Sequence, residues 1–319
     1  MNGQFLKSDR VYMSVISGYN LYLDSGKRTK TISCEEAINV THINSGEEYY
    51  LVKLNSSKSN LSLNDWINVI LNPACKNFFW PIDIVEADDN YLVFPCKFIS
   101  DVTSLNELAN KEDFLGLEKS IIKPIISNLL QAFISLYSHS YLYHIWDDKK
   151  IFISRDGTDL LISFCDALSL VDKEEKVVIG KDLFYSEYTD PYIFSKDCSY
   201  DYNSEMYALA AIIFHLLIGR FPYEGGLLDS VPKDSENWMN SYIDTPVFIF
   251  DKHDNRNAIG DFSNEKIFLR RWNSLTDEMK NMFCNLFTES NIMRKREIAV
   301  YSPIEWLDAV SKFDFKLKN

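Results

Sequence analysis

Residues 141–167 read YLYHIWDDKKIFISRDGTDLLISFCDA, and this stretch decides the fold that we expect. It begins with a polar loop and continues with two short β-rich runs, Ile151–Ser154 and Leu160–Phe164. The dipeptide Asp156–Gly157 between the runs is typical of a tight turn. The stretch therefore predicts a β-hairpin that lies between two polar loops.

The sequence before residue 97 is rich in short β-type runs separated by Gly and Ser turns. One helix is expected among them, and Pro73 ends it. The predicted strands are Val11–Ile16, Leu21–Leu23, Lys30–Ile32, Ala37–His42, Tyr49–Leu54, Phe79–Glu86 and Tyr91–Phe94, and the predicted helix is Ser62–Asn72. We therefore expect residues 1–97 to form a small β-rich lobe with one helix.

Residues 98–319 are expected to form a larger, mainly helical lobe. The predicted helices are Ser104–Asn110, a long helix from about Ser120 to His139, Ser204–Ile218, and two tail helices near Thr276–Glu289 and Pro303–Phe313. The helix Ser204–Ile218 is apolar nearly all round, which indicates a central position in the lobe. Ser204 is its expected N-cap and Gly219 lies just past its end. The sequence thus predicts an α+β protein of two lobes.

Composition narrows the classes of partner. The chain has 319 residues, a formal net charge of −13 and a pI near 4.9. Nucleic acid and anionic membranes need a basic surface, so both are disfavoured, whereas a basic protein partner is compatible. No run of 18 apolar residues and no signal-peptide core occur, so we expect a cytoplasmic protein that does not span a membrane.

The cysteines point to the same compartment. They are scattered singly and form no C-x-x-C pair, so we expect free thiols in a reducing cytosol rather than a disulfide or zinc framework. They are Cys34, Cys75, Cys96, Cys165, Cys198 and Cys284.

Three local strings carry a resemblance to a known family. They are Asn77–Val85 (NFFWPIDIV) with Val93–Pro95; Tyr143–Ile153 (YHIWDDKKIFI) with Leu160–Ala167 (LLISFCDA); and Thr245–Asp251 (TPVFIFD) with Asn255–Asn257 and Arg271–Trp272. A small β-rich lobe followed by a large helical lobe resembles the protein-kinase architecture. The three strings together resemble the bacterial protein-kinase-like family linked to tellurite resistance, the TerY-associated kinases, over residues 30–310.

The resemblance implies a degenerate catalytic site. In an active kinase the first loop carries an Asp that accepts the substrate hydroxyl proton and an Asn that binds magnesium, and a second metal-binding Asp follows the hairpin. Ile145, Lys150 and Phe164 stand in these three positions. Ile145 cannot accept a proton, the cation of Lys150 would repel a metal ion, and Phe164 offers no ligand. We therefore expect no catalytic residue and no metal site at these positions.

The nucleotide-binding positions are also altered. The glycine-rich phosphate loop of the family falls on residues 33–40 (SCEEAINV), which contain no glycine and two glutamates. Such a loop needs glycine so that backbone N–H groups can approach phosphates closely. Lys53 matches the strand lysine that contacts the phosphates, and Asp65 is the acid on the next helix that could pair with it. We expect no cofactor. If ATP and Mg²⁺ do bind, Lys53 and Asp65 are the residues expected to contact them.

Two further departures concern the helical lobe. Asp190–Pro191–Tyr192 replaces the Pro–Pro–Glu of the family, which removes the carboxylate that kinases pair with a late arginine such as Arg296. Glu205 replaces the helix Asp that braces the catalytic loop. Because all these changes remove metal and nucleotide contacts, the sequence is interpreted as a pseudokinase, a kinase fold without phosphotransfer.

An enzymatic alternative remains open. Asp147 and Asp166 each lie two residues beyond a lost catalytic position, so they could replace the base and the metal ligand. With Lys53 they would make an atypical Ser/Thr protein kinase or a nucleotidyl transferase. The simpler interpretation is that Asp147 and Asp148 are solvated loop acids and that Asp166 caps a turn. A third possibility is a switch that binds ATP without turnover.

Two aromatic features could serve a partner. Trp146 either plugs the empty cleft or anchors another protein. The segment Tyr185–Tyr202 is either a docking surface or a packed loop.

The interpretation that we favour is a catalytically inactive, cytoplasmic scaffold or regulator. By resemblance, its partners would be an active kinase relative, a von Willebrand A-type protein or a metal-dependent Ser/Thr phosphatase. The setting would be a bacterial stress or tellurite response.

Overall fold

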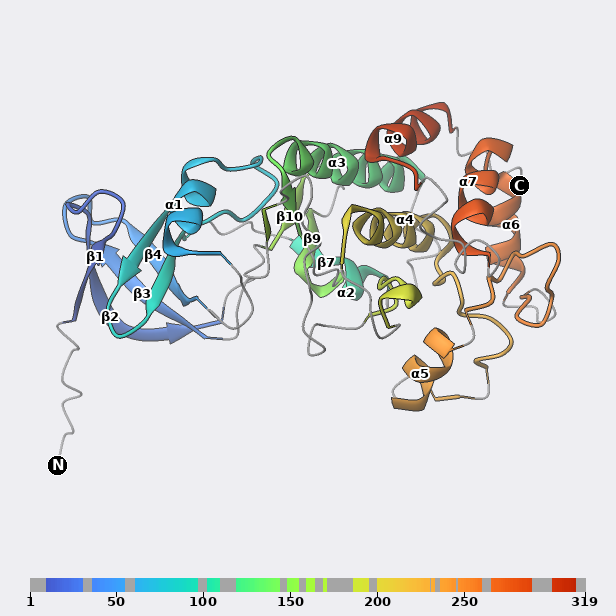
Figure 1. Ribbon diagram of the computed structural model, residues 1–319, viewed down its shortest axis with the longest axis horizontal. Coiled ribbons are helices and arrows are strands. Elements are labelled where there is room, and N and C mark those ends of the chain that lie inside the picture. The colour runs from blue at the N-terminus through green and yellow to red at the C-terminus, as the bar shows by residue number, and fades with distance from the viewer. Residues whose placement is uncertain are drawn as a thin grey trace.

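The protein is a mixed α+β structure. A computed structural model describes residues 10–30, 36–54, 61–96, 102–109, 119–143, 148–154, 159–163, 169–170, 186–194, 200–229, 231–232, 236–244, 246–259, 265–288 and 300–313. Its N-terminal part is a closed six-stranded antiparallel β-barrel, and a largely helical region follows (Figure 1). The two parts lie at opposite ends of the long axis in Figure 1. The α+β class is confirmed, and this arrangement is consistent with two lobes.

The barrel is closed by its first strand. Its strands are β1 (Val11–Ser14), β2 (Leu21–Thr29), β3 (Ala37–His42), β4 (Glu48–Lys53), β5 (Asp83–Glu86) and β6 (Asn90–Pro95). They pair in the order β1-β2-β3-β4-β6-β5, and β5 pairs again with β1. Strand β3 has the predicted bounds. The predicted strand Lys30–Ile32 lies mostly outside the described residues, and Lys30 itself follows the end of β2.

Aromatic and branched side chains fill the barrel because side chains alternate between the two faces of a strand. The interior cluster comprises Tyr12, Tyr22, Val40, Leu51, Val85 and Val93. The interior also holds the buried carboxylate of Asp83, which accepts hydrogen bonds from Ser14 Oγ at 2.8 Å and from the Tyr22 hydroxyl at 3.0 Å. Burial, and then the charge of Asp83, raises the pKa of Tyr22. These bonds tie β1, β2 and β5 together where the barrel closes.

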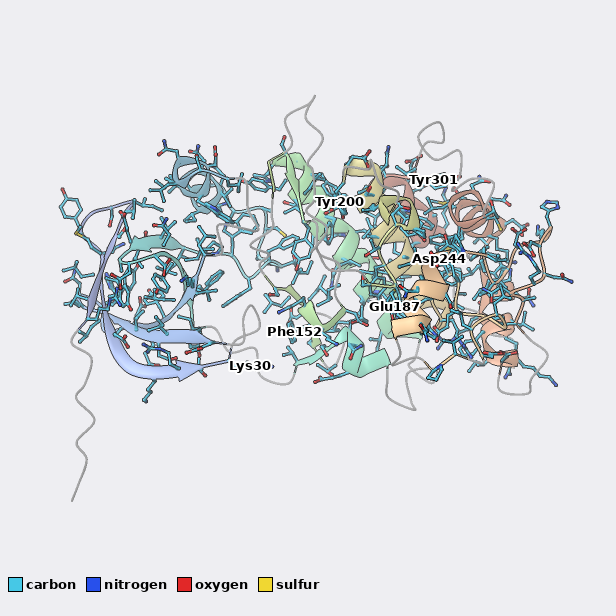
Figure 2. The ribbon with its side chains drawn as sticks, turned by 60° about the horizontal axis from the view of Figure 1, so that its bottom comes forward. Lys30, Phe152, Glu187, Tyr200, Asp244 and Tyr301 are labelled. Atoms are coloured by element: carbon cyan, nitrogen blue, oxygen red, sulfur yellow. The ribbon has the colours of Figure 1, made fainter. Side chains whose placement is uncertain are left out.

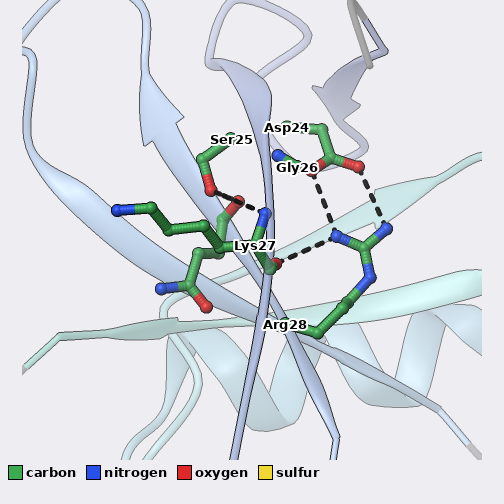
Figure 3. Close-up of polar contacts among 6 residues, drawn as sticks. Asp24, Ser25, Gly26, Lys27 and Arg28 are labelled. Atoms are coloured by element: carbon green, nitrogen blue, oxygen red, sulfur yellow. Dashed lines mark hydrogen bonds and ion pairs between the residues drawn. The ribbon is translucent and has the colours of Figure 1, made fainter. Parts of the chain in front are cut away.

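A second buried carboxylate explains why β2 runs past the predicted end at Leu23. The register of β2 shifts between Asp24 and Arg28. Asp24 Oδ1 accepts from the backbone N–H of Gly26 at 2.7 Å and from Arg28 Nη1 at 3.2 Å (Figure 3). Gly26 has φ +73°, a left-handed conformation that glycine adopts without strain. The bulge is therefore held by local contacts, and the strand continues beyond it.

Helix α1 (Leu63–Leu71) follows the barrel strand β4, as predicted. The Ser62 hydroxyl accepts from the backbone N–H of Asp65, and the Asp65 carboxylate accepts from the backbone N–H of Ser62, which makes a capping box. Trp66, Val69 and Ile70 are the buried residues of the helix. One face of α1 therefore joins the main hydrophobic core.

The helical region begins with short strands and two helices and ends with a helical bundle. Its elements are β7 (Val102–Ser104), α2 (Leu105–Ala109), α3 (Lys119–Ser138), β8 (Tyr141–Leu142), η2 (Asp148–Lys150), β9 (Ile151–Ser154), β10 (Leu160–Ile162), β11 (Ser169–Leu170), η3 (Pro191–Phe194), α4 (Tyr202–Ile218), α5 (Glu236–Asp244), α6 (Lys266–Ser274), α7 (Asp277–Phe287) and α9 (Pro303–Lys312). The hairpin β9–β10 is confirmed, and β7 joins its other edge. Helices α5 and α6 were not predicted, because segments of nine residues are too short to show a clear helical period.

Helix α4 occupies the centre of this region, as its apolar sequence predicted. Every described side chain from Ser204 to Ile218 is buried. The predicted N-cap is wrong by three positions: Asp201 caps the helix, and its carboxylate accepts from the backbone N–H of Ser204 at 3.0 Å. Gly219 ends the helix with φ +89°, as predicted. The helix therefore starts one turn earlier than its apolar stretch.

Helix α3 packs along α4 and α9. Residues Ile121–Ser138 have the length and apolar composition that could cross a membrane, a test that core helices of soluble proteins also pass. The expectation that the chain does not span a membrane stays a prediction.

The third sequence string has a packing role. The Asn257 amide is buried, and its Nδ2 donates to the carbonyls of Val247 at 2.7 Å and Tyr223 at 2.8 Å. Its Oδ1 accepts from the backbone N–H of Leu227 at 2.9 Å. One side chain thereby connects three loop segments.

We expect Asn257→Ala to lower the free energy of unfolding by about 2 kcal/mol, because two buried carbonyls and one N–H lose their partner. The measurement is urea unfolding followed by tryptophan fluorescence. Asn255→Ala is the matched control, since Asn255 is exposed two residues away and should change stability by about 0.5 kcal/mol or less. Equal losses in both variants would contradict the packing role.

Candidate functional site

The described residues include part of the expected site. Lys53, Asp65 and Lys150 are described, whereas Ile145, Trp146, Asp147, Phe164 and Asp166 lie outside the described residues. The predictions on those five residues therefore stay predictions. The structure informs them through the residues that flank them.

Lys53 makes an exposed ion pair at the end of β4. Its Nζ lies 2.6 Å from Asp89 Oδ2, in the turn between β5 and β6, and 61% of its side chain is exposed. The hydrogen bond to Asp89 raises the pKa of Lys53. The chain thus neutralises the lysine with its own carboxylate.

The alternation of β4 shows which way Lys53 points. Tyr50 and Val52 pack against the core cluster that contains the buried face of α1. Leu51 belongs to the barrel interior. Since residues two apart share a face, Lys53 lies on the same face as Leu51, opposite the face that packs with α1. Lys53 therefore projects from the end of the barrel, away from the helix expected to supply its partner.

Asp65 is engaged at the N-terminus of α1. Its carboxylate accepts from both the backbone N–H and the hydroxyl of Ser62, at 2.9 and 2.6 Å, and the hydroxyl contact is the main reason its pKa is lowered. The expected pair of Lys53 with Asp65 is thus replaced by two separate contacts. The physical reason is that the first turn of a helix exposes unpaired N–H groups, which a nearby carboxylate satisfies.

The loop that precedes Ile145 is held by a buried acid. The Glu205 side chain is fully buried at the start of α4. Its Oε1 accepts from the backbone N–H of Tyr143 at 2.7 Å, and its Oε2 accepts from the Tyr200 hydroxyl at 2.6 Å. Tyr200 lies among the helices of the C-terminal region (Figure 2). The interpretation of Glu205 as a lost brace is therefore wrong, because the longer side chain still reaches the loop backbone.

Lys150 lies next to the residue that precedes Phe164. The backbone N–H of Ser163 donates to the Lys150 carbonyl at 2.8 Å, and the Tyr143 hydroxyl donates to the Ser163 carbonyl at 2.7 Å. The segments that carry the degenerate positions Ile145, Lys150 and Phe164 are thereby brought together. Lys150 takes part through its backbone carbonyl, at the sequence position where a metal-binding Asn was expected.

Asp148 is not the solvated loop acid that the sequence suggested. It is buried at the start of η2, and its Oδ2 accepts from Asn106 Nδ2 at 3.2 Å and from the Tyr188 hydroxyl at 3.3 Å. The Tyr188 oxygen also lies 2.8 Å from His215 Nδ1. Burial, and then the charge of Asp148, raises the pKa of Tyr188 well above its usual value. Local sequence could not show this network, because its four members come from separate segments.

The same contacts bear on the segment Tyr185–Tyr202. Within its described residues, Tyr188, Asp190 and Tyr200 are buried. Tyr188 and Tyr200 each bond to a buried acid, Asp148 and Glu205. These residues favour the packed-loop alternative for their part of the segment, while residues 185 and 195–199 lie outside the described residues.

A groove among the described residues lies apart from the expected site. The groove, of about 590 Å³, lies between residues 73–82 and the end of the β9–β10 hairpin. Phe79, Ile82 and Leu161 are among its lining residues, and neither Lys53 nor Lys150 lines it. Among the described side chains, no group of three or more His, Cys, Asp or Glu could hold a metal ion.

Comparison with known proteins adds no family. No protein-family model matches the chain, and no curated protein matches it.

Proposed function

We propose that this chain is a bilobal, protein-kinase-like protein that has lost phosphotransfer and works by binding another protein. The observation that carries the proposal is the placement of Lys53. The lysine expected to hold a nucleotide phosphate lies on the strand face opposite α1 and is paired with Asp89. The cation that would contact the phosphates in a kinase is thus held by a carboxylate of the chain itself.

Several features support the kinase-like part of the proposal. A helix follows the strand that ends in Lys53, as in kinases, where a strand lysine precedes the helix that carries its partner. The paired strands β9 and β10 follow residues 144–147 in the chain, and α4 supplies an acid to the backbone N–H of Tyr143, just before them. Lys30, where the connection to β3 begins, lies on the side of the barrel that faces the helical region (Figure 2).

Other features support the loss of catalysis. The connection between β2 and β3 contains no glycine, and the catalytic position two residues after Tyr143 is Ile145. The backbone beside these positions is held by hydrogen bonds, since Glu205 binds the N–H of Tyr143 and Ser163 binds the carbonyl of Lys150. An ordered backbone that carries unreactive side chains supports a binding role rather than a catalytic one.

The partners follow from the resemblance to the TerY-associated kinases. We propose an active kinase relative, a von Willebrand A-type protein or a Ser/Thr phosphatase, in a cytoplasmic bacterial stress or tellurite response. The three sequence strings support this assignment.

A thermal-shift series tests the loss of nucleotide binding. We expect ATP or ADP, with Mg²⁺ or Mn²⁺, to leave the melting temperature of the wild type unchanged. A ligand present at 100 times its Kd would add about 2.7 kcal/mol of stability, which the series would detect as a shift of several degrees. Lys53→Ala is the matched variant and is expected to give the same flat response.

A nucleotide-dependent shift that disappears in Lys53→Ala would contradict the proposal. Autophosphorylation or AMP transfer by the purified chain would instead establish the enzymatic alternative, with Asp147→Asn and Asp166→Asn as the variants that should abolish it.

A further inference from the structure

A buried polar cluster joins three segments of the helical region. The Tyr188 hydroxyl oxygen lies 2.8 Å from His215 Nδ1 and 3.3 Å from Asp148 Oδ2. Tyr188 is 1% exposed, His215 7% and Asp148 8%. His215 belongs to α4, Asp148 opens η2 directly after residues 144–147, and Tyr188 lies in the described segment 186–194. Two hydrogen bonds thus connect the central helix with two segments whose connection the proposed binding role leaves unexplained.

The chemistry of the three groups fixes the direction of these hydrogen bonds. An ionised carboxylate only accepts, and a phenol has a single hydrogen to donate. If the lone pairs of the Tyr188 oxygen faced Asp148 at 3.3 Å, two electron-rich oxygens would repel each other, so Tyr188 donates to Asp148. The Tyr188 oxygen then accepts from His215, and Nδ1 of His215 carries a hydrogen. The imidazolium and one of the two neutral tautomers both meet this condition.

The position of His215 in α4 favours the imidazolium. It lies in the last turn of the helix, which ends at Gly219, and the negative end of the helix dipole stabilises a cation there. The centroid of the Phe221 ring lies 4.2 Å from that of the imidazole, which is close enough for the ring to attract a cation. Burial acts against the charged form. The helix end and the aromatic ring offset that cost.

The charges around Tyr188 act in the same direction. The described groups whose charge bears on Tyr188 are Asp148, Glu187 and Tyr242 of α5. Burial raises the pKa of Tyr242 well above its usual value, so this tyrosine is neutral near pH 7. Both carboxylates favour a positive His215, which is separated from Asp148 by a single hydroxyl group.

The helices that pack on α4 bring their described polar groups to other residues of it. They are α3, α6 and α7. Arg271 of α6 donates to the Leu217 carbonyl at 3.5 Å, two residues on from His215 and so about 200° around the helix. Tyr137 of α3 lies near Glu205, at the other end of α4, and α7 contributes phenylalanine rings. The described titratable groups set against His215 are therefore those around Tyr188.

We propose that His215, Tyr188 and Asp148 form a pH-sensitive strut in the helical region. With the imidazole protonated, charge-assisted hydrogen bonds hold Asp148 and Tyr188 against α4. When the pH rises, the proton on Nε2 leaves to solvent, and the bond from Nδ1 loses its charge and weakens. The segments that begin at Asp148 and at residue 186 are then held less firmly. The strut adds control by pH to the proposed binding role, and its chemistry does not depend on whether the cleft binds nucleotide.

The test is urea unfolding of the full chain between about pH 5.5 and about pH 9, with His215→Asn as the variant. Asn offers an N–H donor close to the Nδ1 position and does not titrate. Because the fold favours the charged imidazole, its stabilisation is present below the ordinary histidine pKa of about 6.5 and is lost as the pH rises. We expect the unfolding constant of the variant, divided by that of the wild type, to be about tenfold larger at the lower pH. His253→Asn, at an exposed position, is the matched control, and its ratio should stay within about twofold.

A second variant isolates the link through Tyr188. Tyr188→Phe keeps the ring and removes the hydroxyl that joins His215 to Asp148. In that background, His215→Asn should change the ratio between the two pH values by less than about threefold, because the imidazole no longer reaches the carboxylate. A purely structural role of His215 would lower the stability by the same factor at every pH.

A measurement on the wild type keeps the test valid if a variant does not fold. Nuclear magnetic resonance of the ring nitrogens follows the protonation of each of the five histidines. We expect one imidazole with a hydrogen on Nδ1 to remain protonated about one pH unit above the ordinary histidine pKa.

Three results would overturn the inference. They are a ratio for His215→Asn that is constant across the pH range, a ratio that grows as the pH rises, and a wild type in which no imidazole is protonated above the ordinary histidine pKa. The second result would mean that burial keeps His215 neutral. Circular dichroism checks that each variant is folded at both pH values. A nucleotide-induced thermal shift would contradict the lost phosphotransfer and leave these outcomes unaffected.

Discussion

Glu205→Ala is expected to lower the free energy of unfolding by about 3 kcal/mol or more, since a hydrogen bond to a charged group contributes about 1.5–3 kcal/mol and this buried carboxylate accepts from both Tyr143 and Tyr200. Tyr143 donates its backbone N–H and Tyr200 its hydroxyl, and both buried donors would lose this acceptor. The loop that leads to Ile145 should loosen at the same time. Urea unfolding measures the first effect, and hydrogen exchange at the Tyr143 amide measures the second.

Conservative variants separate the two hydrogen bonds of Glu205. Glu205→Gln keeps one oxygen acceptor and should lose less stability than Glu205→Ala. Tyr200→Phe removes one donor and should lose about 1–2 kcal/mol. Glu205→Asp, the residue that the family resemblance expects, tests whether the extra methylene is needed to reach the loop. Wild-type stability and slow Tyr143 exchange in Glu205→Ala would show that the loop is held by other contacts.

Phe214→Ala should produce the other large loss, about 3–5 kcal/mol, because removing a buried ring loses its transfer free energy and leaves a cavity. Phe214 is fully buried in the middle of α4. Its ring lies near the rings of Phe248, Phe250, Trp272, Phe283 and Phe287, at centroid distances from 5.1 to 6.3 Å. These residues come from α6, α7 and the loop between α5 and α6. The loss should therefore appear in the whole helical region.

Calorimetry gives the change in melting temperature for Phe214→Ala. Phe214→Leu refills most of the volume and should lose roughly half as much, whereas Ile304→Ala on the exposed side of α9 should stay within about 0.5 kcal/mol of the wild type. If Phe214→Ala and Ile304→Ala had the same melting temperature, α4 would not be the centre of the helical core.

Helix α4 could be predicted because its sequence carries the necessary information locally. Seventeen residues from Tyr202 to Ile218 include no proline or glycine, and the apolar run has no polar face, so a buried helix satisfies its backbone within the segment itself, away from water. The pairing of β9 with β10 was predictable for a similar reason, since the dipeptide Asp156–Gly157 separates two short apolar runs in the sequence. Helices α5 and α6 were not predicted because each has only nine residues, which is shorter than the window over which a helical period can be recognised.

The closed barrel could not be predicted. Sequence patterns showed short strands but could not show that β1 pairs with β5, about 70 residues later, through Met13 and Glu86. Asp83 supports that pairing, because its carboxylate accepts hydrogen bonds from side chains of β1 and β2. A lone Asp at the start of a strand gives no local sign of such a role.

For the candidate site, too, the sequence predicted some features and could not predict others. The sequence identified the unsuitable side chains Ile145, Lys150 and Phe164 at the reactive positions, because residue type alone excludes proton transfer and metal binding. It could not predict the partners of Lys53 and Asp65, since the side of a strand from which a lysine projects depends on the register of the whole barrel. It also could not predict that Glu205 reaches the Tyr143 backbone.

By itself, the sequence determined the α+β composition, the central apolar helix and the chemical character of each expected catalytic position, because these depend on residue type and short-range periodicity. Only the tertiary structure decided which polar groups meet: Glu205 with Tyr143, Asp148 with Tyr188, and Lys53 with Asp89. Such contacts join residues 36 to 62 positions apart. Their formation depends on how the buried surfaces of separate elements pack, which no local pattern in the chain records.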